Sequence, residues 1–493
     1  MTQPRPTFGA APHAAWFLIA VSLYFAAQIV LRLILGGALE TDEAEMMVMT
    51  PGLRLGYGPQ LPLYNWLQVG LFALFGKSLF ALSLLKNLLL WLTYVLTFAG
   101  LRLFMPAGLA VAGALSLFLL PDVAWEAQRA TTHSNMLLVT CAATLAAFFW
   151  TLKSGRWAAY VALGLALGLG GLAKYNYWLV PLGLYAAGLS IAALRPRLLC
   201  ARMAVVPVIA GLVLAAPYGW MLRNPELAFS STHKLKMAQA AQPSSGLASG
   251  LPALLEGMAA LAVLPALVAL ALYLAFRSRA AGAASERAEA VAVRLLWRAS
   301  ALVALVLAAG VVAAGVGHVT PRWLLPLAFL AVPALFVGLF GRLAGRGPLA
   351  YYAVLGLLAV AVMTGLCFDR YKQTARRAVD FAPLPGRLQQ IADMSHTPVV
   401  AEFFVAGNLA RSQPEWRVSP YLAFAAPRFG GETVLFLSRQ GIPPDLPSGM
   451  AQAGWPREAS AEVLEQGEVV LGFDSSDKPL PLSYWLVRTP ALD

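Results

Sequence analysis

Four carboxylates lie within six residues near the start of the chain, directly after an apolar run over residues 14–37. They are Glu40, Asp42, Glu43 and Glu45. Charge is costly near lipid, so acids at the end of an apolar helix are candidates for function. A partly desolvated carboxylate there holds a proton more readily and can act as a general base. The alternatives are a solvated charge cluster, or capping of a helix over residues 43–49 by Thr41 or Asp42.

Four bases are predicted near the outer ends of apolar runs. Arg129 and Arg322 each lie next to such a run, and Lys174 lies in the turn between two of them. Lys86 lies about two turns inside its run. Cations around an outer cavity suit a phosphate leaving group or an anionic lipid headgroup. The alternative for each is snorkelling to the interface, although Lys86 does not easily reach water.

Two histidines, His133 and His318, stand without cysteine or an acid at metal-ligand spacing. They predict polar cavity residues more than metal ligands, so no metal site is predicted and a divalent cation is left open as a cofactor. No glycine-rich phosphate loop stands in a strand–helix context, and no nucleophile-elbow serine is present. The sequence therefore gives no support to an ATP or nucleotide-sugar site.

The composition predicts an integral membrane protein. Of 493 residues, 59% are hydrophobic and 12% are charged, with a mean hydropathy of +0.68. A soluble protein has roughly 25% charged residues. The net charge of +12 could suggest nucleic acid, but the bases gather in short loops between apolar runs. That placement indicates a bilayer and no nucleic-acid partner.

Eleven apolar runs approach the 17 to 25 residues needed to cross a bilayer. They cover residues 14–37, 78–101, 106–121, 134–152, 156–173, 177–194, 201–221, 251–276, 294–315, 322–341 and 348–367. With the N-terminus inside, the inner loops carry a large excess of Arg and Lys. This excess sets the orientation and places the acidic motif and the C-terminal region outside.

Two outer loops are longer than a connection needs. Residues 38–77 carry the acidic motif and then an apolar segment, 63–72, that begins with Tyr and suits an interfacial helix. Residues 222–250 are polar and predict either a mobile cover over a site or a disordered connector.

The composition changes at the end of the apolar runs, so residues 1–367 and 368–493 predict two domains. In the second, alternating or β-branched runs predict strands over 398–405, 432–437, 468–473 and 484–487. At least one helix fits between the first two strands. We therefore expect a membrane all-α domain followed by a small α/β domain on the outer face.

These features together resemble the polyprenyl-phosphate-sugar glycosyltransferases of the GT-C fold. The resemblance rests on the first apolar run, the Asp42-Glu43 pair and the following loop Gly56-Tyr-Gly-Pro-Gln-Leu-Pro-Leu-Tyr-Asn-Trp66. It covers residues 14–370 and is strongest for the protein mannosyltransferase and aminoarabinose transferase group. The turn 171–174 is similar to that group's Ala-Lys turn. The Tyr-Gly-Pro-Gln loop is similar to a bacterial subgroup that includes lipopolysaccharide galacturonosyltransferases.

The resemblance implies the chemistry and the roles of residues. Asp42 would deprotonate the acceptor hydroxyl, with Glu43 as its partner in the catalytic pair. The bases already named would hold the donor phosphate: Lys174, Arg322, Lys86 and Arg129. The remaining substrate-binding candidates are polar or aromatic residues on the outer side: Tyr57, Gln60, Tyr64, His133, Asn135 and His318.

The chain also departs from that group. Aminoarabinose transferases have Glu-Lys in the loop where Pro59-Gln60 stand here, and an Arg where Glu45 stands. The acid expected at the start of the fourth run corresponds to Asn135. A donor sugar other than aminoarabinose is therefore expected.

The sequence thus predicts a multi-span glycosyltransferase of a bacterial inner membrane with a periplasmic C-terminal domain. Its partners would be a polyprenyl-phosphate-sugar donor, a glycolipid acceptor such as lipid A or lipopolysaccharide core, and the bilayer. Protein is the second acceptor. The alternative from another class, a lipid or sugar transporter, predicts polar residues near mid-membrane and often repeat symmetry.

Overall fold

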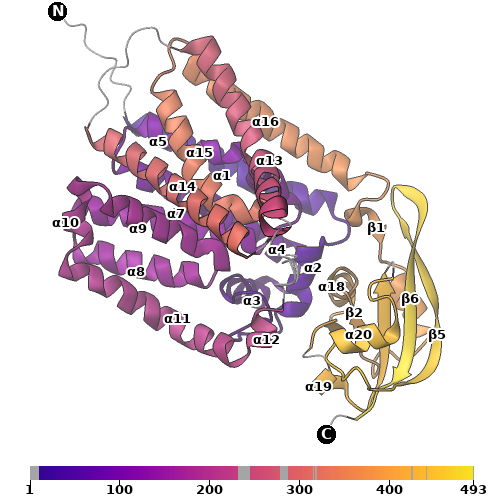
Figure 1. The fold of residues 1–493 in the computed structure, drawn as a ribbon. Helices are drawn as coiled ribbons and strands as arrows, with labels where there is room; N and C mark the ends of the chain where they lie inside the picture. The colour runs from indigo at the N-terminus through magenta and orange to yellow at the C-terminus, as the bar shows by residue number, and fades with distance from the viewer. Residues whose placement is uncertain are drawn as a thin grey trace, which may run out of the picture.

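A computed structural model describes residues 10–230, 245–277, 287–314, 316, 319–423, 426–439 and 441–491. An elongated bundle of helices forms most of the molecule, and a smaller sheet domain lies at one end of it (Figure 1). His318 and residues 231–244, the middle of the predicted cover over residues 222–250, lie outside the described residues.

Within the described residues, eight helices are long and apolar enough to cross a membrane. Most are hydrophobic on all sides, as expected of segments that contact both lipid and neighbouring helices. They are α1 (Ala10–Leu35), α4 (Leu79–Arg102), α7 (His133–Ser154), α11 (Val205–Arg223), α13 (Ser245–Phe276), α14 (Arg287–Ala313), α15 (Leu325–Phe340) and α16 (Gly347–Arg370).

The three other predicted runs are also helical, but they are short or bent. Helix α5 (Ala107–Leu115) leads through a 3-10 turn to a 79° bend, after which the π-helix η2 (Asp122–Glu126) and α6 (Ala127–Arg129) follow. Helix α9 (Leu179–Leu189) bends by 104° into α10 (Arg195–Leu198).

Helix α8 (Trp157–Gly171) has 15 residues. At 1.5 Å per residue it is about 22 Å long, less than the hydrocarbon core of about 30 Å. The described residues therefore give eight spans, or up to ten if each bent pair is one span.

The first outer loop contains two helices, α2 (Thr41–Met49) and α3 (Leu63–Phe75). The helix predicted over residues 63–72 is thus confirmed as α3. The helix predicted as the alternative for residues 43–49 begins two residues earlier, so Asp42 and Glu43 lie in its first turn. Helix α2 is short and mostly buried, and its position is therefore set by what packs around it.

A six-stranded sheet forms the centre of the C-terminal domain, in the order β1-β5-β6-β4-β2-β3. The strands are β1 (Val379–Asp380), β2 (Val399–Ala401), β3 (Val418–Pro420), β4 (Thr433–Arg439), β5 (Glu462–Phe473) and β6 (Ser476–Arg488). Strand β2 is parallel to β3 and β4, and the other pairs are antiparallel.

Three of the four predicted strands are confirmed as parts of β4, β5 and β6. The strand predicted over 398–405 is wrong in its second half, because the chain turns into helix α18 (Phe403–Ser412). The side chain of Glu402 accepts a hydrogen bond from the backbone N of Phe404 at 3.0 Å. This cap satisfies a donor of the first turn and ends the strand.

The two faces of the sheet bury different residues, because successive strand residues point to opposite sides. Leu435 and Leu437 pack with α17 (Leu384–Gln389) and α18 on one face. Val434 and Phe436 pack with α19 (Ala426–Phe429) and α20 (Leu446–Gln452) on the other.

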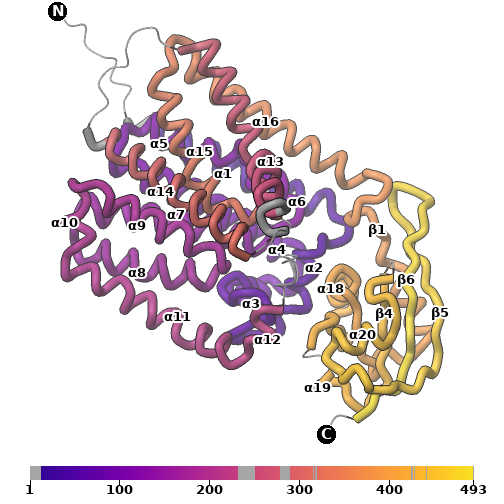
Figure 2. Tube along the Cα trace, viewed as in Figure 1, coloured from indigo at the N-terminus to yellow at the C-terminus, as the bar shows by residue number. Residues whose placement is uncertain are grey.

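Helix α18 is the contact between the sheet domain and α2, at the junction seen in Figure 2. A Cβ added to Gly407 of α18 would lie 2.1 Å from the carbonyl oxygen of Ala44 in α2, so only glycine permits this approach. Ala38, in the loop before α2, belongs to the same apolar core as Phe404 and Leu409. The first outer loop and the C-terminal domain therefore pack as one unit.

Candidate active site

The carboxylates of the acidic motif lie in different environments. Glu43 is 1% exposed and Glu40 is 2% exposed, whereas Asp42 is half-buried. Neighbouring residues on a helix are about 100° apart, so Asp42 and Glu43 point in different directions from α2. The two acids of the predicted catalytic pair are thus separated by the helix that carries them.

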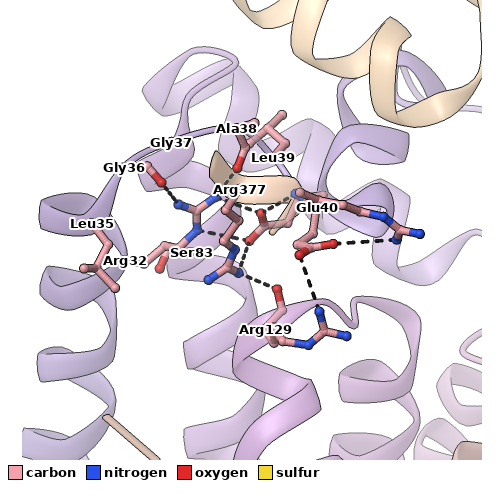
Figure 3. A network of polar contacts seen from close by, with 12 residues as sticks. Arg32, Leu35, Gly36, Gly37, Ala38, Leu39, Glu40, Ser83, Arg129 and Arg377 are labelled. Atoms are coloured by element: carbon pink, nitrogen blue, oxygen red, sulfur yellow. Dashed lines mark hydrogen bonds and ion pairs between the residues drawn. The ribbon is translucent and has the colours of Figure 1, made fainter. Parts of the chain in front are cut away.

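Glu43 is surrounded by three bases from three parts of the chain. Its carboxylate lies 2.9 Å from Nη2 of Arg32 in α1 and 3.0 Å from Nζ of Lys86 in α4. Nη2 of Arg377, in the segment that enters the sheet domain, lies 3.6 Å away. Figure 3 shows Arg32 and Arg377 converging on this point. Each of these side chains is almost fully buried.

These cations decide the charge of Glu43. Burial alone would raise the pKa of the carboxyl, but Arg32, Lys86 and Arg377 hold it well below its usual range. Burial and the neighbouring charge of Arg32 lower the pKa of Arg377 to about 10, so it remains a cation at neutral pH. A carboxylate this strongly held is a poor proton acceptor, and Lys86 is occupied by it. We assign both to the support of α2.

Glu40 makes a second, looser contact set at the start of α2. Its carboxylate points toward Arg129 (Figure 3), from which it lies 3.5 Å away. Arg376 lies 3.8 Å from the same carboxylate. Burial raises its pKa, and the surrounding arginines oppose that rise. Its backbone N donates to Oε2 of Glu43 at 3.1 Å, which fixes the first turn of the helix. Arg129 also pairs with Glu126, whose carboxylate lies 3.3 Å from its Nη2.

Asp42 belongs to a different group, centred on Lys174. The ammonium of Lys174 lies in electrostatic range of Asp42, Asp122 and Arg322. Its Nζ donates a hydrogen bond to Oγ of Ser134 at 2.9 Å. Burial, and then the charge of Arg322, lower the pKa of Lys174 to about 8, while the two acids act in the opposite direction. This group thus contains two acids and two bases.

Asp122 is the member of this group that the sequence analysis missed. It begins the π-helix η2, directly after Pro121, and its charge interacts with Glu126, Arg322 and Lys174. Sequence comparison pointed to Asn135, but that side chain is fully buried and bonded within its own turn, to the carbonyl O of Thr131 at 3.0 Å. The available signal was an acid next to proline at the outer end of an apolar run.

The other predicted substrate contacts lie near α3 or in the loop before it. Nε2 of His133 lies 3.0 Å from Oδ1 of Asn65, and its ring lies 5.2 Å from that of Tyr64. Tyr57 and Gln60 form a backbone bridge within the tight loop 57–60. Among the described residues, no three His, Cys, Asp or Glu side chains gather as metal ligands would.

The fold is that of the GT-C membrane glycosyltransferases. ArnT from Cupriavidus metallidurans, in the apo state, aligns over 97% of this chain and 98% of its own with a TM-score of 0.57 at 16% identity. The structure of ArnT bound to undecaprenyl phosphate aligns with a TM-score of 0.54, also at 16% identity, over 97% of this chain and 98% of its own. Residues 58–220 match the dolichyl-phosphate-mannose-protein mannosyltransferase family.

Two sequence relatives are much more similar. The lipopolysaccharide core galacturonosyltransferase RgtA of Rhizobium johnstonii is 36% identical over 71% of this chain and 70% of its own length. RgtB of the same organism is 31% identical over 81% of this chain and 82% of its own. The chain belongs to this family of lipopolysaccharide core galacturonosyltransferases, and it is a membrane glycosyltransferase. Because the chain belongs to a family of enzymes, the comparisons favour the glycosyltransferase over the transporter alternative.

Proposed function

We propose that this protein transfers a sugar from a polyprenyl-phosphate donor to a lipopolysaccharide core or related envelope glycolipid, with Asp42 as the general base. The observation that carries the proposal is the separation of the two acids of the motif. The carboxylate of Glu43 forms ion pairs with three buried bases. Asp42, in contrast, is half-buried and belongs to the group around Lys174. This difference supports Asp42, and not Glu43, as the proton acceptor of the pair.

In this mechanism the Asp42 carboxylate accepts the proton of an acceptor hydroxyl. The hydroxyl oxygen then forms a bond to the anomeric carbon of the donor sugar, and the bond from that carbon to the phosphate oxygen breaks. The electron pair leaves with the polyprenyl phosphate. Lys174 and Arg322 stabilise the negative charge that develops on this leaving group.

The nature of the relatives supports the choice of substrates. RgtA and RgtB are lipopolysaccharide core galacturonosyltransferases, and one ArnT structure holds undecaprenyl phosphate. A galacturonosyl donor and a core acceptor are therefore our first choice for this chain. We place the reaction at the periplasmic face of a bacterial inner membrane, where the positive-inside rule puts the site.

A protein acceptor is the second candidate, favoured by the match of residues 58–220 to the protein mannosyltransferase family. Comparing envelope glycolipids by mass spectrometry, with and without the gene, separates the two candidates. A glycolipid that loses one sugar mass identifies both sugar and acceptor. Unchanged glycolipids together with an altered glycoprotein would favour the second candidate.

Replacement of Asp42 by Asn tests the general base. We expect sugar transfer in membranes to fall by about 10² to 10⁴, the usual contribution of general-base catalysis, at unchanged protein level. Transfer at the wild-type rate by D42N would contradict the assigned role.

A further inference from the structure

A cavity lies near the acidic motif, and it is separate from the group of charges around Lys174. It has a volume of about 410 Å³ and is enclosed by the first outer loop, helices α11 and α12 (Pro225–Ala228), and α19 of the sheet domain. These elements meet at the junction of bundle and sheet domain (Figure 2). Its wall includes Met49, Arg54, Tyr57, Trp220, Leu227 and Arg428.

The loop that carries Arg54 is held rigidly in the wall. The backbone N of Arg54 donates to the hydroxyl of Tyr57 at 2.9 Å, and that hydroxyl donates to the carbonyl O of Gly52 at 2.6 Å. On the other side, Nε1 of Trp66 donates to the carbonyl O of Arg54 at 2.7 Å. The backbone of Arg54 is therefore fixed by side chains in both directions, while its own side chain is exposed.

An aromatic ring forms another part of the wall. The indole of Trp220 packs so closely on Gly56 that an added Cβ would lie 2.0 Å from the ring. The wall therefore joins a large apolar surface to a polar rim, a combination typical of small-molecule sites. The apolar face of a sugar ring could pack against such an indole.

The charges in the wall have one sign. Arg54 comes from the first outer loop and Arg428 from α19, and none of the described residues that line the cavity is acidic. Burial lowers the pKa of Arg428, and the like charge of Arg54 lowers it further. Two guanidinium groups in one cavity wall give it a positive charge that attracts an anion. Guanidinium is suited to bidentate binding of carboxylate or phosphate.

We propose that this cavity binds an acidic group of the acceptor glycolipid, a sugar carboxylate or a phosphate, through Arg54 and Arg428. The inference rests on the proposed function. Helix α2 connects the cavity to the base, since Met49 lines it and Asp42 lies seven residues earlier. At 1.5 Å per residue this separation is about 10 Å, which a short saccharide bridges. The acidic group would thus be held while a neighbouring hydroxyl reaches Asp42.

The test uses the full-length enzyme in liposomes, with core glycolipid from cells lacking the gene as acceptor. Three acceptor preparations are compared: native, carboxyl-reduced and dephosphorylated. The variants are Arg54→Ala, Arg428→Ala, Arg428→Lys and the control Arg457→Ala, an exposed arginine of the same domain that does not line the cavity. We expect KM for the native acceptor to rise about tenfold in each cavity Ala variant, with donor KM and kcat little changed.

Arg428→Lys should recover part of the affinity, because it keeps the charge and loses the bidentate contact. Removal of the acidic group that binds should raise the wild-type KM to that of the Ala variants and make the variants equal to wild type. Equal acceptor KM in all cavity variants and wild type would overturn the inference while leaving the proposed function intact. Failure of wild type to use any core acceptor would instead contradict the proposed function.

A bilayer lipid is the other source of an anionic headgroup. The same assays in liposomes with and without phosphatidylglycerol separate the two sources. If the cavity variants change the dependence on phosphatidylglycerol but leave acceptor KM unchanged, the cavity binds bilayer lipid and the inference is wrong.

Discussion

Asp42 and Glu43 are adjacent in the chain, yet their surroundings assign them different tasks. Glu43 is the acid of a buried cluster that contains three bases, and Asp42 is half-buried. Buried charge is tolerated only when it is paired and hydrogen-bonded. The cluster joins α1, α4 and the start of the sheet domain, so Glu43 holds together three segments that are remote in sequence.

Replacement of Glu43 by Gln should therefore destabilise the protein. It would leave Arg32, Lys86 and Arg377 buried without their counter-ion, and breaking a buried pair costs about 3–5 kcal/mol. Thermal unfolding in detergent measures the effect, with D42N as the control that keeps wild-type stability. A wild-type melting temperature for E43Q would contradict the positioning role.

The difference in stability between wild type and E43Q should depend on pH in a defined direction. The folded-state pKa of Glu43 is lowered, so its contribution to stability is fully present above the unfolded-state pKa of about 4.3. That contribution is lost as pH falls from there toward the folded-state value. The stability difference between wild type and E43Q should be largest near neutrality and shrink in acid.

The proposed contact of Lys174 with the donor phosphate predicts a pH dependence of catalysis. With a pKa of about 8, its ammonium loses its proton as pH rises through that value, and the donor phosphate then loses a cation. We expect KM for the donor to rise above about pH 8, because the free enzyme loses this cation there. In Lys174→Arg the alkaline limb should move upward, because guanidinium stays protonated. An alkaline limb in K174R identical to that of wild type would exclude Lys174 as its origin.

The sequence indicates which residues have the chemistry of a site better than it indicates which residues they contact. The charges of Asp42 and Arg322 act on Lys174, and the sequence predicts all three at the ends of apolar runs. The ion pair of Lys86 with Glu43 could not be predicted, since its partners are 43 residues apart. Arg377 is more remote still, and no local pattern reports such a contact.

At the scale of elements, α2 is held on two sides. On one side lie α1 and α4 with the buried cluster, and on the other lies α18. Asn408 of α18 accepts from the backbone N of Leu39 at 2.8 Å and donates to its carbonyl O at 3.3 Å. Arg411 donates to the carbonyl O of Gly37 at 3.0 Å. The sheet domain therefore fixes the loop that leads into α2.

Replacement of Gly407 by Ala tests this support. Its new methyl group would meet the backbone of Ala44, so α2 must shift by ångströms, and a 1 Å misplacement of a catalytic group can cost about a hundredfold in rate. We expect a loss of kcat of that order with correct membrane insertion. The matched control is Gly386→Ala in α17, where an added Cβ meets nothing within 4 Å. Equal activity of G407A and G386A would show that α18 does not position α2.

Elements were predicted unevenly, for physical reasons. Long apolar runs specify helices because lipid leaves the backbone no other partner. The bend before Asp122 was missed, since the hydropathy of residues 106–121 does not report the 79° change of direction. The sheet edge was also missed, because β1 and β3 have two and three residues and carry no period of their own.

The two ends of the whole molecule differ in charge, and this difference predicts its orientation in the membrane. The sheet domain lies at the end of the bundle that carries the acidic motif, and α10, with Arg195 and Arg197, lies at the far end (Figure 1). Short cytoplasmic loops collect Arg and Lys. This arrangement predicts that the active site and the cavity between bundle and sheet domain face the periplasm together.

Fusions of alkaline phosphatase test this orientation, because the enzyme needs disulfides that form in the periplasm and not in the cytosol. We expect a fusion at the C-terminus to be active, and a fusion after Gly345, in the turn between α15 and α16, to be inactive. The two sites are separated by the single span α16, so their activities must be opposite if α16 crosses the bilayer. An active fusion at Gly345 with an inactive one at the C-terminus would reverse the topology. It would place Asp42 on the cytosolic side, where a periplasmic transfer reaction could not occur.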